Sequence, residues 1–387
     1  MRVFVLSDHF VHKGGRAHGG TTYLLNSLPA MSAAGVRLTA VFMGESHPLT
    51  GRLRDAGVDV QCLHLSKWDP RSLYAFWPFL RAQPFDLLHL LCFKSHLVGQ
   101  LAAARLRMPA VVHVHDRNVL PPPLRMPMRW ASRNLAALVG VSEPVTRFAA
   151  QQYGVPLSRC HTIENGLDFA AFARPACEGR GLREELGLDE RRRLIAVVGR
   201  VQRFKGQLAL IECMPEIARR VPEACLLVVG DGPDRAQCER AAAELGVREH
   251  VRFLGHRDDV ARILSEVEIS VMPTQAEEGL PYAVLEAMSA GLAVLASDAG
   301  GIGTLIQSER NGLLVKRGDR SELIAGVLRL LADDALRARL GSAARERAAD
   351  FSVERHVERM LSLYDSVLSA AGLRAGKGSP RPAAPPL

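Results

Sequence analysis

Residues 194–219 read LIAVVGRVQRFKGQLALIECMPEIAR, and this stretch decides the fold class. Five apolar residues at 194–198 are followed by a loop that begins with Gly199 and ends with Gly206, and then by apolar residues at helical spacing. A short, β-branched apolar run predicts a strand that is buried on both faces. A strand, a glycine-bounded loop and a helix in this order are typical of a parallel sheet covered by helices, in which ligands bind at the carboxyl ends of the strands.

The same alternation continues in both directions along the chain. Helical spacing recurs at 22–33, 206–219 and 235–245. The predicted strands are 3–7, 38–43, 87–91, 110–114, 137–141 and 160–163 in the first half, and 194–198, 224–229, 251–253, 269–272, 293–296 and 312–315 in the second. Two such series predict an α/β chain of two doubly wound, Rossmann-like domains that face a cleft.

The alternation of predicted strands and helices is interrupted at 171–192, which contains Arg174-Pro175 and a charged run from Arg183. We therefore predict an N-terminal domain at 1–170, a linker at 171–192 and a C-terminal domain at 193–349. Residues 350–371 have the spacing of an amphipathic helix, with Ser352 as its candidate N-cap. Residues 373–387 are rich in Gly, Pro, Ser and Ala and are predicted to be disordered.

The composition excludes several classes of protein. No stretch approaches the roughly 20 apolar residues of a membrane-spanning helix. The apolar start at residues 3–6 is too short for a signal peptide. The seven cysteines form no Cys-x-x-Cys pair, so neither a zinc site nor a disulfide framework is indicated. We therefore expect a cytoplasmic protein.

The net charge of +8 lies in the first half of the chain. Residues 1–170 contain 18 Lys and Arg against 10 Asp and Glu, whereas the remaining 217 residues contain 31 of each. A basic half indicates nucleic acid, an anionic membrane surface or an anionic small substrate, or only an arginine-rich solvated surface. No helix-turn-helix, zinc-finger or RNP pattern is present, so nucleic acid is not expected as a partner.

The loop at 199–206 carries two cations, Arg200 and Lys205, directly after a predicted strand. Gly199 permits a tight turn and a close approach to a ligand. The forked guanidinium and the compact ammonium together suit a diphosphate, although two solvated surface cations remain the alternative.

A second motif reads EGLPYAVLE at 278–286 and contains two glutamates. Pro281 suits the first turn of a helix, which places Glu278 in the preceding loop and Glu286 on the second turn. A carboxylate there can accept hydrogen bonds from two vicinal hydroxyls of a ribose or hexose. The alternative is a capping Glu278 and a solvated Glu286. Against it, Glu286 lies in an apolar run, where an unpaired charge is costly.

Arg200, Lys205 and the Glu278 and Glu286 pair together resemble family 4 of the retaining nucleotide-sugar glycosyltransferases, which have the two-domain GT-B architecture. The resemblance spans nearly the whole chain. Further segments in the family order are GG at 19–20, VHVHD at 112–116, VSE at 141–143, IENGLD at 163–168, VGDGP at 229–233, FLGH at 253–256 and EAMSAG at 286–291. Together, the order and spacing of these segments indicate the family more specifically than any single segment does.

The resemblance implies roles for the matching residues. Arg200 and Lys205 would be catalytic cations that hold the donor diphosphate, and Glu286 would bind the ribose hydroxyls. Glu278 would be a catalytic residue facing the donor sugar, and His115 would be a catalytic residue near the reacting centre. The other donor-binding positions would be Gly20, Gly255, His256, Gly279 and Leu280. The first domain would bind the acceptor, the second would bind the nucleotide sugar, and helix 350–371 would pack back on the first.

The chain departs from the family pattern at three places, and it carries two histidines where one is expected to act. His113 is on the same strand face as His115, so one of the two is expected to serve packing. Thr21-Thr22 stand where many relatives carry residues like Ala-Glu-Arg. Leu280-Pro281 replace the commoner Phe-Gly and remove one backbone donor, and Glu164 stands where the family commonly has proline.

The implied activity is a retaining, metal-independent hexosyltransferase that needs no cofactor. The sequence is compatible, since no Asp-x-Asp pair ends a predicted strand. The expected donor is a nucleoside-diphosphate sugar, and the expected role is in cell-envelope, lipopolysaccharide or exopolysaccharide biosynthesis. The alternatives are a nucleotide-sugar epimerase, a GT-B phosphorylase or a non-catalytic sugar-nucleotide-binding protein.

Because the excess positive charge lies in the predicted acceptor domain, we expect an anionic or lipid-linked glycan acceptor. Peripheral contact with an anionic membrane is a further expectation. It would involve the aromatic-rich segment 68–85 or the face with Arg125, Arg129 and Arg133 at a spacing of four. The alternative for both is an ordinary helix that packs on the sheet.

Overall fold

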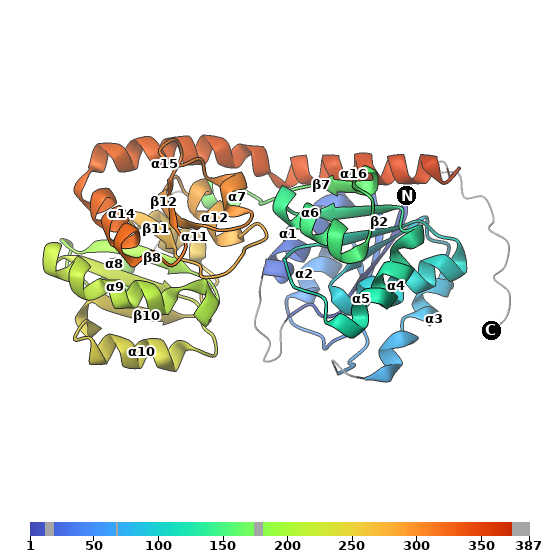
Figure 1. Cartoon of the computed structure of the whole chain (residues 1–387), viewed down its shortest axis with the longest axis horizontal. Coiled ribbons are helices and arrows are strands. Elements are labelled where there is room, and N and C mark those ends of the chain that lie inside the picture. Colours follow the sequence, from blue (N-terminus) through green and yellow to red (C-terminus); the bar gives the residue numbers. More distant parts are fainter. Residues whose placement is uncertain (12–18, 67–68, 174–180, 374–387) are drawn as a thin grey trace. The chain divides into compact units, whose positions relative to one another are not determined.

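The computed structural model describes residues 1–11, 19–66, 69–173 and 181–373. The chain divides into two units: the first comprises Met1–Gly166 and Val353–Leu387, and the second comprises Leu167–Ser352. Each unit holds one parallel sheet with helices on both faces (Figure 1), so the predicted α/β doubly wound fold is confirmed. The predicted tail from residue 374 onward, residues 174–180 of the predicted linker and Trp68 lie outside the described residues.

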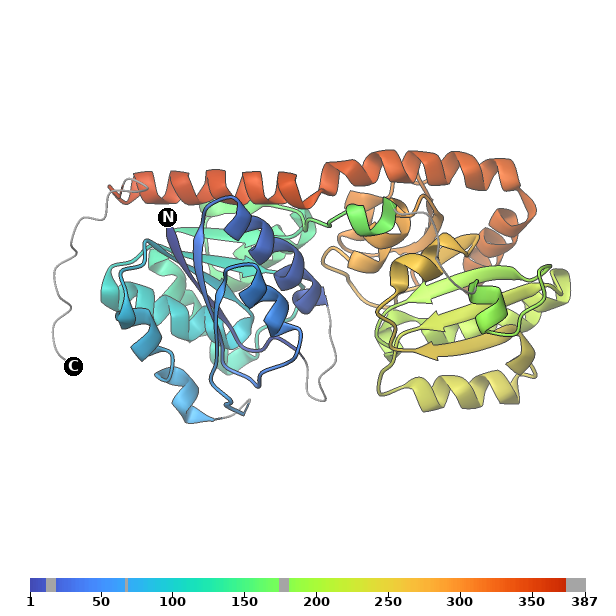
Figure 2. The same ribbon diagram turned by 180° about the vertical axis from the view of Figure 1, so that it is seen from behind.

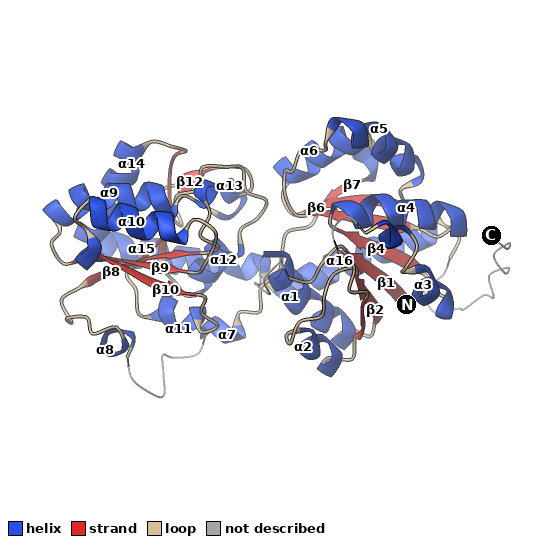
Figure 3. Ribbon diagram, turned by 90° about the horizontal axis from the view of Figure 1, so that it is seen from below, coloured by secondary structure: helices blue, strands red, loops and turns tan. Residues whose placement is uncertain are grey.

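The first sheet has seven strands in the order β3-β2-β1-β4-β5-β6-β7. The strands are β1 (Arg2–Ser7), β2 (Arg37–Phe42), β3 (Asp59–Cys62), β4 (Leu87–Leu91), β5 (Ala110–Val114), β6 (Ala137–Gly140) and β7 (Cys160–Thr162). The helices are α1 (Gly19–Ala33), α2 (Thr50–Asp55), α3 (Trp77–Ala82), α4 (Phe93–Leu106), α5 (Pro122–Ala131), α6 (Glu143–Tyr153) and α16 (Val353–Ala370). Figure 3 shows α4, α5 and α6 on one face of this sheet, with α1 and α2 on the other.

The second sheet has six strands in the order β10-β9-β8-β11-β12-β13. The strands are β8 (Arg193–Val198), β9 (Ala224–Val229), β10 (Val251–Gly255), β11 (Ile269–Met272), β12 (Ala293–Asp298) and β13 (Leu313–Lys316). The helices are α7 (Ala170–Ala173), α8 (Leu182–Glu185), α9 (Gln207–Arg220), α10 (Arg235–Glu244), α11 (Val260–Ser265), α12 (Tyr282–Ser289), α13 (Ile302–Leu305), α14 (Arg320–Ala332) and α15 (Asp334–Ala348). Strand residues such as Ile195, Val197 and Leu226 pack with Leu210 and Met214 of α9 in a fully buried core.

Two differences from the sequence analysis have clear physical causes. Strand β3 was not predicted, because it is a four-residue edge strand whose alternation of polar and apolar residues is too short to recognise. The helix predicted at 350–371 is shorter: α16 begins at Val353, directly after the predicted N-cap Ser352, and Ala349–Phe351 form a separate 3₁₀ turn. The backbone N–H of Leu167 donates to the carbonyl of Phe351, and this pairing interrupts the helix.

Helix α16 belongs to the first unit and lies alongside α1 (Figure 2). Its buried face carries His356, Met360 and Tyr364. Within the described ranges, no helix is both long enough and apolar enough to cross a bilayer.

Candidate functional site

The candidate donor site lies at the carboxyl edge of the second sheet, where β8 and β11 are neighbours. The chain leaves β8 toward β9 on one side, and it leaves β11 toward β12 on the other. In doubly wound sheets such a reversal leaves a crevice between the two loops, and ligands bind there. The loops after β8 and β11 carry the two motifs singled out in the sequence.

These two loops are held together by their backbones. The N–H of Gln275 donates to the carbonyl of Phe204 at 2.6 Å, and the Thr274 hydroxyl oxygen lies 3.0 Å from the same oxygen. Gly206 has φ of +82°, and a Cβ there would lie 1.8 Å from the carbonyl oxygen of Pro273. Only glycine therefore allows the loops to approach this closely.

Lys205 and Glu278 form an ion pair across the two loops. The ammonium lies 2.8 Å and 3.0 Å from the two carboxylate oxygens, and the Thr274 hydroxyl donates to Oε1 at 2.9 Å. The Glu278 side chain is only 10% exposed and that of Lys205 is 23% exposed. The structure therefore brings two predicted catalytic residues together, with both oxygens of the carboxylate occupied.

A third loop, which follows β12, fixes the backbone of Glu278. The N–H of Gly301 donates to the Glu278 carbonyl at 2.9 Å, and a Cβ on Gly300 would lie 2.2 Å from that oxygen. Residues 279–281 are buried beside this contact and lead directly into α12. Pro281 was predicted in the first turn of the helix, but it precedes the helix in an extended conformation. Its ring fixes the chain that enters α12.

Glu286 lies on α12, as predicted from the motif, and the residue as a whole is half-buried. Burial raises the pKa of Glu286 from 4.5 to about 7. Burial is the one cause of this shift, and no hydrogen bond from the described residues lowers the pKa of this carboxylate. A desolvated carboxyl group with free acceptor positions is able to receive the hydroxyls of a ligand.

Arg200 follows β8 and is half-buried. Its Nε is buried and has no hydrogen-bond partner among the described residues, whereas its backbone carbonyl accepts from the Gln207 amide at 3.1 Å. The preceding Gly199 has φ of +140°, and a Cβ there would meet no atom within 4 Å. The open space beside Gly199 and the unpaired Nε of Arg200 fit the predicted anion site.

The predicted nucleobase loop follows β10. The carbonyl of Gly255 accepts from the N–H of Gly230 at 2.7 Å, and Gly255 has φ of +69°. His256 is exposed and lies 3.4 Å from Asp258. Arg257 is paired with Glu185 of α8 at 2.6 Å, so the described end of the predicted linker packs against the second unit.

The remaining predicted residues, Gly20 and His115, belong to the first unit. Gly20 is the second residue of α1, and His115 follows the carboxyl end of β5. His115 is half-buried and its Nε2 has no hydrogen-bond partner among the described residues. His113, by contrast, is fully buried, and its Nδ1 lies 3.3 Å from Nε2 of His89. His113 is therefore a core residue of the first unit, and His115 is the histidine nearer the carboxyl edge.

Three contacts were missed by the sequence analysis. Thr274, which binds Glu278, gave no signal, because a single threonine after a strand is common. The departure at Glu164 now has a structural explanation: its carboxylate pairs with Arg359 of α16 at 2.5 Å, which a proline could not do. Thr21 is also structural, since its buried hydroxyl donates to the carbonyl of Phe10 at 2.7 Å.

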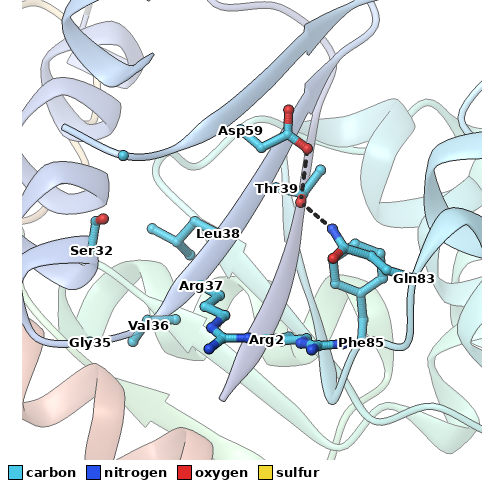
Figure 4. A pocket seen from close by; sticks show the side chains of 11 residues that line it. Arg2, Ser32, Gly35, Val36, Arg37, Leu38, Thr39, Asp59, Gln83 and Phe85 are labelled. Atoms are coloured by element: carbon cyan, nitrogen blue, oxygen red, sulfur yellow. Dashed lines mark hydrogen bonds between the residues drawn. The ribbon is translucent and has the colours of Figure 1, made fainter. Parts of the chain in front are cut away.

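A cavity of about 370 Å³ opens at the opposite, amino edge of the first sheet (Figure 4). Arg2, Arg37, Thr39, Asp59 and Gln83 line it. It contains none of the residues with predicted roles, and it is separate from the candidate donor site.

Two doubly wound units, with a cation-bearing loop and two glutamates at the switch point of the second, define the GT-B class of glycosyltransferases. Comparison with known families agrees. Residues 180–347 match the model for glycosyl transferases group 1, and residues 17–171 match that for glycosyltransferase family 4. The chain belongs to this family of glycosyltransferases, and the predicted enzyme class is confirmed.

Individual relatives are similar over most of their length. The chain is 30% identical to a D-inositol 3-phosphate glycosyltransferase of Salinispora arenicola, covering 74% of this chain and 70% of that protein. It is 26% identical to the Escherichia coli UDP-Gal:alpha-D-GlcNAc-diphosphoundecaprenol alpha-1,3-galactosyltransferase, covering 83% and 87%. Anabaena HepE in complex with UDP has a similar fold, with a TM-score of 0.80 at 22% identity over 95% of this chain and 100% of that chain. This chain is accordingly a glycosyltransferase that uses a nucleotide sugar.

Among the described residues, no three His, Cys, Asp or Glu side chains are placed to hold a metal ion. Metal independence stays a prediction, to be checked by transfer assays with and without EDTA.

Proposed function

We propose that this chain is a retaining glycosyltransferase that moves a sugar from a nucleoside diphosphate to an anionic or lipid-linked glycan of the cell envelope or an exopolysaccharide. The observation that carries the proposal is the Lys205 and Glu278 ion pair, which joins the loops after the neighbouring strands β8 and β11. Arg200 lies on the first of these loops, and Glu286 lies on α12, which follows the second.

The donor residues divide into an anion site and a hydroxyl site. Arg200 and Lys205 supply two cations for the diphosphate, and Lys205 is already oriented by Glu278. Glu286 supplies acceptor oxygens for the ribose hydroxyls. Gly279 and Leu280 lie beside Glu278, where their backbone would line the sugar pocket, and Gly255 and His256 would meet the base. Gly20 would approach the diphosphate from the first unit.

The arrangement around Glu278 favours attack assisted by the departing diphosphate over a covalent intermediate on this residue. Both of its oxygens accept hydrogen bonds, one from Lys205 and Thr274 and the other from Lys205. A carboxylate held in this way is a poor nucleophile. The cations instead stabilise the charge that develops on the leaving diphosphate, which is electrostatic catalysis by groups already in place. The acceptor would attack from the same face as the leaving group, with His115 contacting a substrate hydroxyl.

The acceptor proposal rests on charge and on two relatives. The first half of the chain carries the whole excess of positive charge. By its name, one relative acts on a diphosphoundecaprenol-linked sugar and another on inositol 3-phosphate. Both of those acceptors carry phosphate, and a basic acceptor unit would attract such a group.

Donor binding gives the first test. We expect one base family among UDP-, GDP-, ADP- and dTDP-sugars to raise the melting temperature, because a ligand at 100 times its Kd adds about 2.7 kcal/mol to the free energy of unfolding. Transfer from that donor is then followed with candidate acceptors, and the anomeric configuration of the product is read by NMR. Inversion at the anomeric carbon would contradict the retaining mechanism. The absence of any shift across the panel would contradict the proposed donor site.

The proposed membrane contact finds support on α5. Met126 and Trp130 are one turn apart on this helix and are 72% and 61% exposed. Arg125, Arg129 and Arg133 are exposed around them, and residues 101–141 contain six arginines and one acidic residue. Exposed apolar side chains ringed by arginine suit the interface of an anionic bilayer.

The aromatic segment at 68–85 gives weaker support for the same contact. Phe76 and Phe85 are buried in the core of the first unit, as the packing alternative predicted. Leu73 and Tyr74 remain exposed, at 57% and 59%.

We expect the protein to cosediment with vesicles that contain anionic phosphatidylglycerol at low salt, and to release at high salt. The double variant Met126→Ser with Trp130→Ser should lose most of this binding, whereas Leu73→Ser should retain it. If the double variant still binds vesicles and Leu73→Ser does not, the contact would lie in the aromatic segment. No binding of the native chain at low salt would end the membrane proposal.

A further inference from the structure

Behind His115, the first unit contains a cluster of histidine and tyrosine side chains. His89, His113 and Tyr364 are completely buried, although each carries polar atoms that need partners. None of these three residues was assigned a functional role by the sequence analysis. They come from three elements far apart in the chain: β4, β5 and the terminal helix α16.

The cluster forms a continuous path from α16 to His115. The Tyr364 hydroxyl lies 2.7 Å from Nδ1 of His89, and Nε2 of His89 lies 3.3 Å from Nδ1 of His113. The His113 ring then stacks on the His115 ring, with centroids 4.3 Å apart and planes inclined by 30°. Each step is a direct contact within one unit.

A second set of contacts joins α16 to the same place. His356 of α16 donates from Nδ1 to the carbonyl of Glu164 at 2.7 Å, next to the Glu164 and Arg359 ion pair. The adjacent Asn165 side chain is within hydrogen-bonding reach of the His115 ring. Both sets of contacts therefore lead from α16 to the His115 ring.

All the rings on the path are neutral at physiological pH. Burial, with the neighbouring histidines, lowers the pKa of His89 and His115 from 6.5 to about 3, and it also lowers the pKa of His113 well below 6.5. In a neutral imidazole one nitrogen donates and the other accepts. Whether the Tyr364 hydroxyl donates to His89 or accepts from it therefore fixes the tautomer of His89. The tautomer of His89 in turn fixes that of His113.

We propose that α16 positions the His115 ring for sugar transfer, through Tyr364, His89 and His113. These three are positioning residues, and only His115 would touch the substrate. The proposal rests on the proposed role of His115 in the reaction. Under this proposal the terminal helix α16 contributes to the reaction as well as to the packing of the first unit, because the hydroxyl of Tyr364 sets the arrangement of the rings on which His115 stacks.

The test compares two tyrosine hydroxyls in the same unit. Tyr364→Phe removes one oxygen atom and keeps the ring that packs on the sheet. Tyr153→Phe is the matched control, because its hydroxyl makes an equally short bond of 2.7 Å to His96, another buried histidine. His96 bonds onward to the backbone carbonyl of His113 at 3.2 Å and not to a ring on the path.

We expect Tyr364→Phe to lower kcat for sugar transfer roughly 10-fold, since small displacements of a reacting group have effects of this size or larger. The KM for the donor should not change, because none of the proposed donor-binding residues belongs to the path. Tyr153→Phe should leave both constants unchanged. Nitrogen-15 spectra of the imidazoles should report altered tautomer populations at His89 and His113 in Tyr364→Phe alone.

Two outcomes would overturn the proposal: an unchanged kcat in Tyr364→Phe, or an equal loss in both phenylalanine variants, which would indicate general loosening. If Tyr364→Phe does not fold, His89→Asn replaces it, since asparagine retains a partner for Tyr364 but cannot reach His113; the same loss of kcat is expected. The variant His115→Ala distinguishes the role proposed for His115 from the positioning path behind it. Full activity in His115→Ala would refute the role proposed for His115, whereas an inactive His115→Ala beside a fully active Tyr364→Phe would refute only the positioning path.

Discussion

Replacing Lys205 with glutamine is expected to lower kcat/KM for sugar transfer roughly 10³-fold, the size seen when one preorganised electrostatic donor is removed from an active site. Lys205 provides one of the two cations at the switch point of the second sheet, and it is held in place by Glu278 at 2.8 Å. In the transition state the bond to the sugar breaks and negative charge accumulates on the diphosphate. A neutral amide cannot offset that charge, so the loss should fall mainly on kcat.

The glutamine is chosen to keep the protein folded. Alanine would leave the buried Glu278 carboxylate without its main partner, and removing one member of a buried pair costs about 3–5 kcal/mol. Glutamine can still donate one hydrogen bond to that carboxylate, and the Thr274 hydroxyl remains beside it. Thermal unfolding and circular dichroism of the variant measure whether the fold is retained.

A matched control removes a cation of the same unit outside the site. Arg317 pairs with Glu277, the residue beside Glu278, at 2.7 Å and is half-exposed. Arg317→Gln changes the net charge by the same amount, and its kcat/KM should stay within about twofold of the native value, as expected of a surface pair. Activity retained in Lys205→Gln, or lost equally in both variants, would contradict a diphosphate site at Lys205.

Most of the fold was predictable because buried parallel strands are continuous apolar runs. The runs at 87–91, 110–114, 224–229 and 269–272 have the same bounds in the sequence analysis and in the structure. The edge strand β3 was missed, since a strand with one solvated face and four residues has little pattern to detect. The turn at 349–351 was missed for another reason. It depends on a hydrogen bond between residues 167 and 351, which are distant in the sequence.

Two parts of the candidate donor site, the loop after β8 and the motif that leads into α12, were predictable. In each, charged residues lie directly beside a strand or helix that the local sequence pattern predicts. The ion pair of Lys205 with Glu278 was not predicted, because it joins two loops 73 residues apart. The same limit applies to the path from Tyr364 to His115, which spans β4, β5 and α16. Local sequence reports the residue types, but only the topology of the sheets brings them together.

Glu286→Gln is expected to make the protein more stable and a far poorer enzyme. Burial raises the pKa of Glu286 to about 7, against 4.5 in the unfolded chain. The folded state therefore holds the proton more tightly than the unfolded state, so ionisation of Glu286 destabilises the fold as the pH rises from about 4.5 to 7. At 1.36 kcal/mol per pKa unit the cost above pH 7 is at most about 3 kcal/mol, and residual solvent contact reduces it.

Glutamine cannot ionise, so the variant should unfold at a higher denaturant concentration than the native chain at pH 8, and the difference should vanish near pH 4.5. Glu346→Gln, at an exposed position of α15, should change the stability at neither pH. Reduced stability of Glu286→Gln at pH 8 would mean that a partner in the folded chain already stabilises the carboxylate.

The same ionisation should govern donor affinity. The ionised carboxylate accepts two charge-assisted hydrogen bonds from ribose hydroxyls, and these are worth about 1.5–3 kcal/mol each. Glu286→Gln should therefore raise the donor KM by roughly 100-fold at pH 8. In the native chain the donor KM should rise as the pH falls below 7, because the protonated group is a weaker acceptor, while the high KM of the variant should not respond to pH in this range. A native KM independent of pH between 5.5 and 8 would place the ribose elsewhere. The expected combination, greater stability with weaker donor binding, follows because the desolvation that makes Glu286 an effective ligand for hydroxyls also destabilises the unliganded fold.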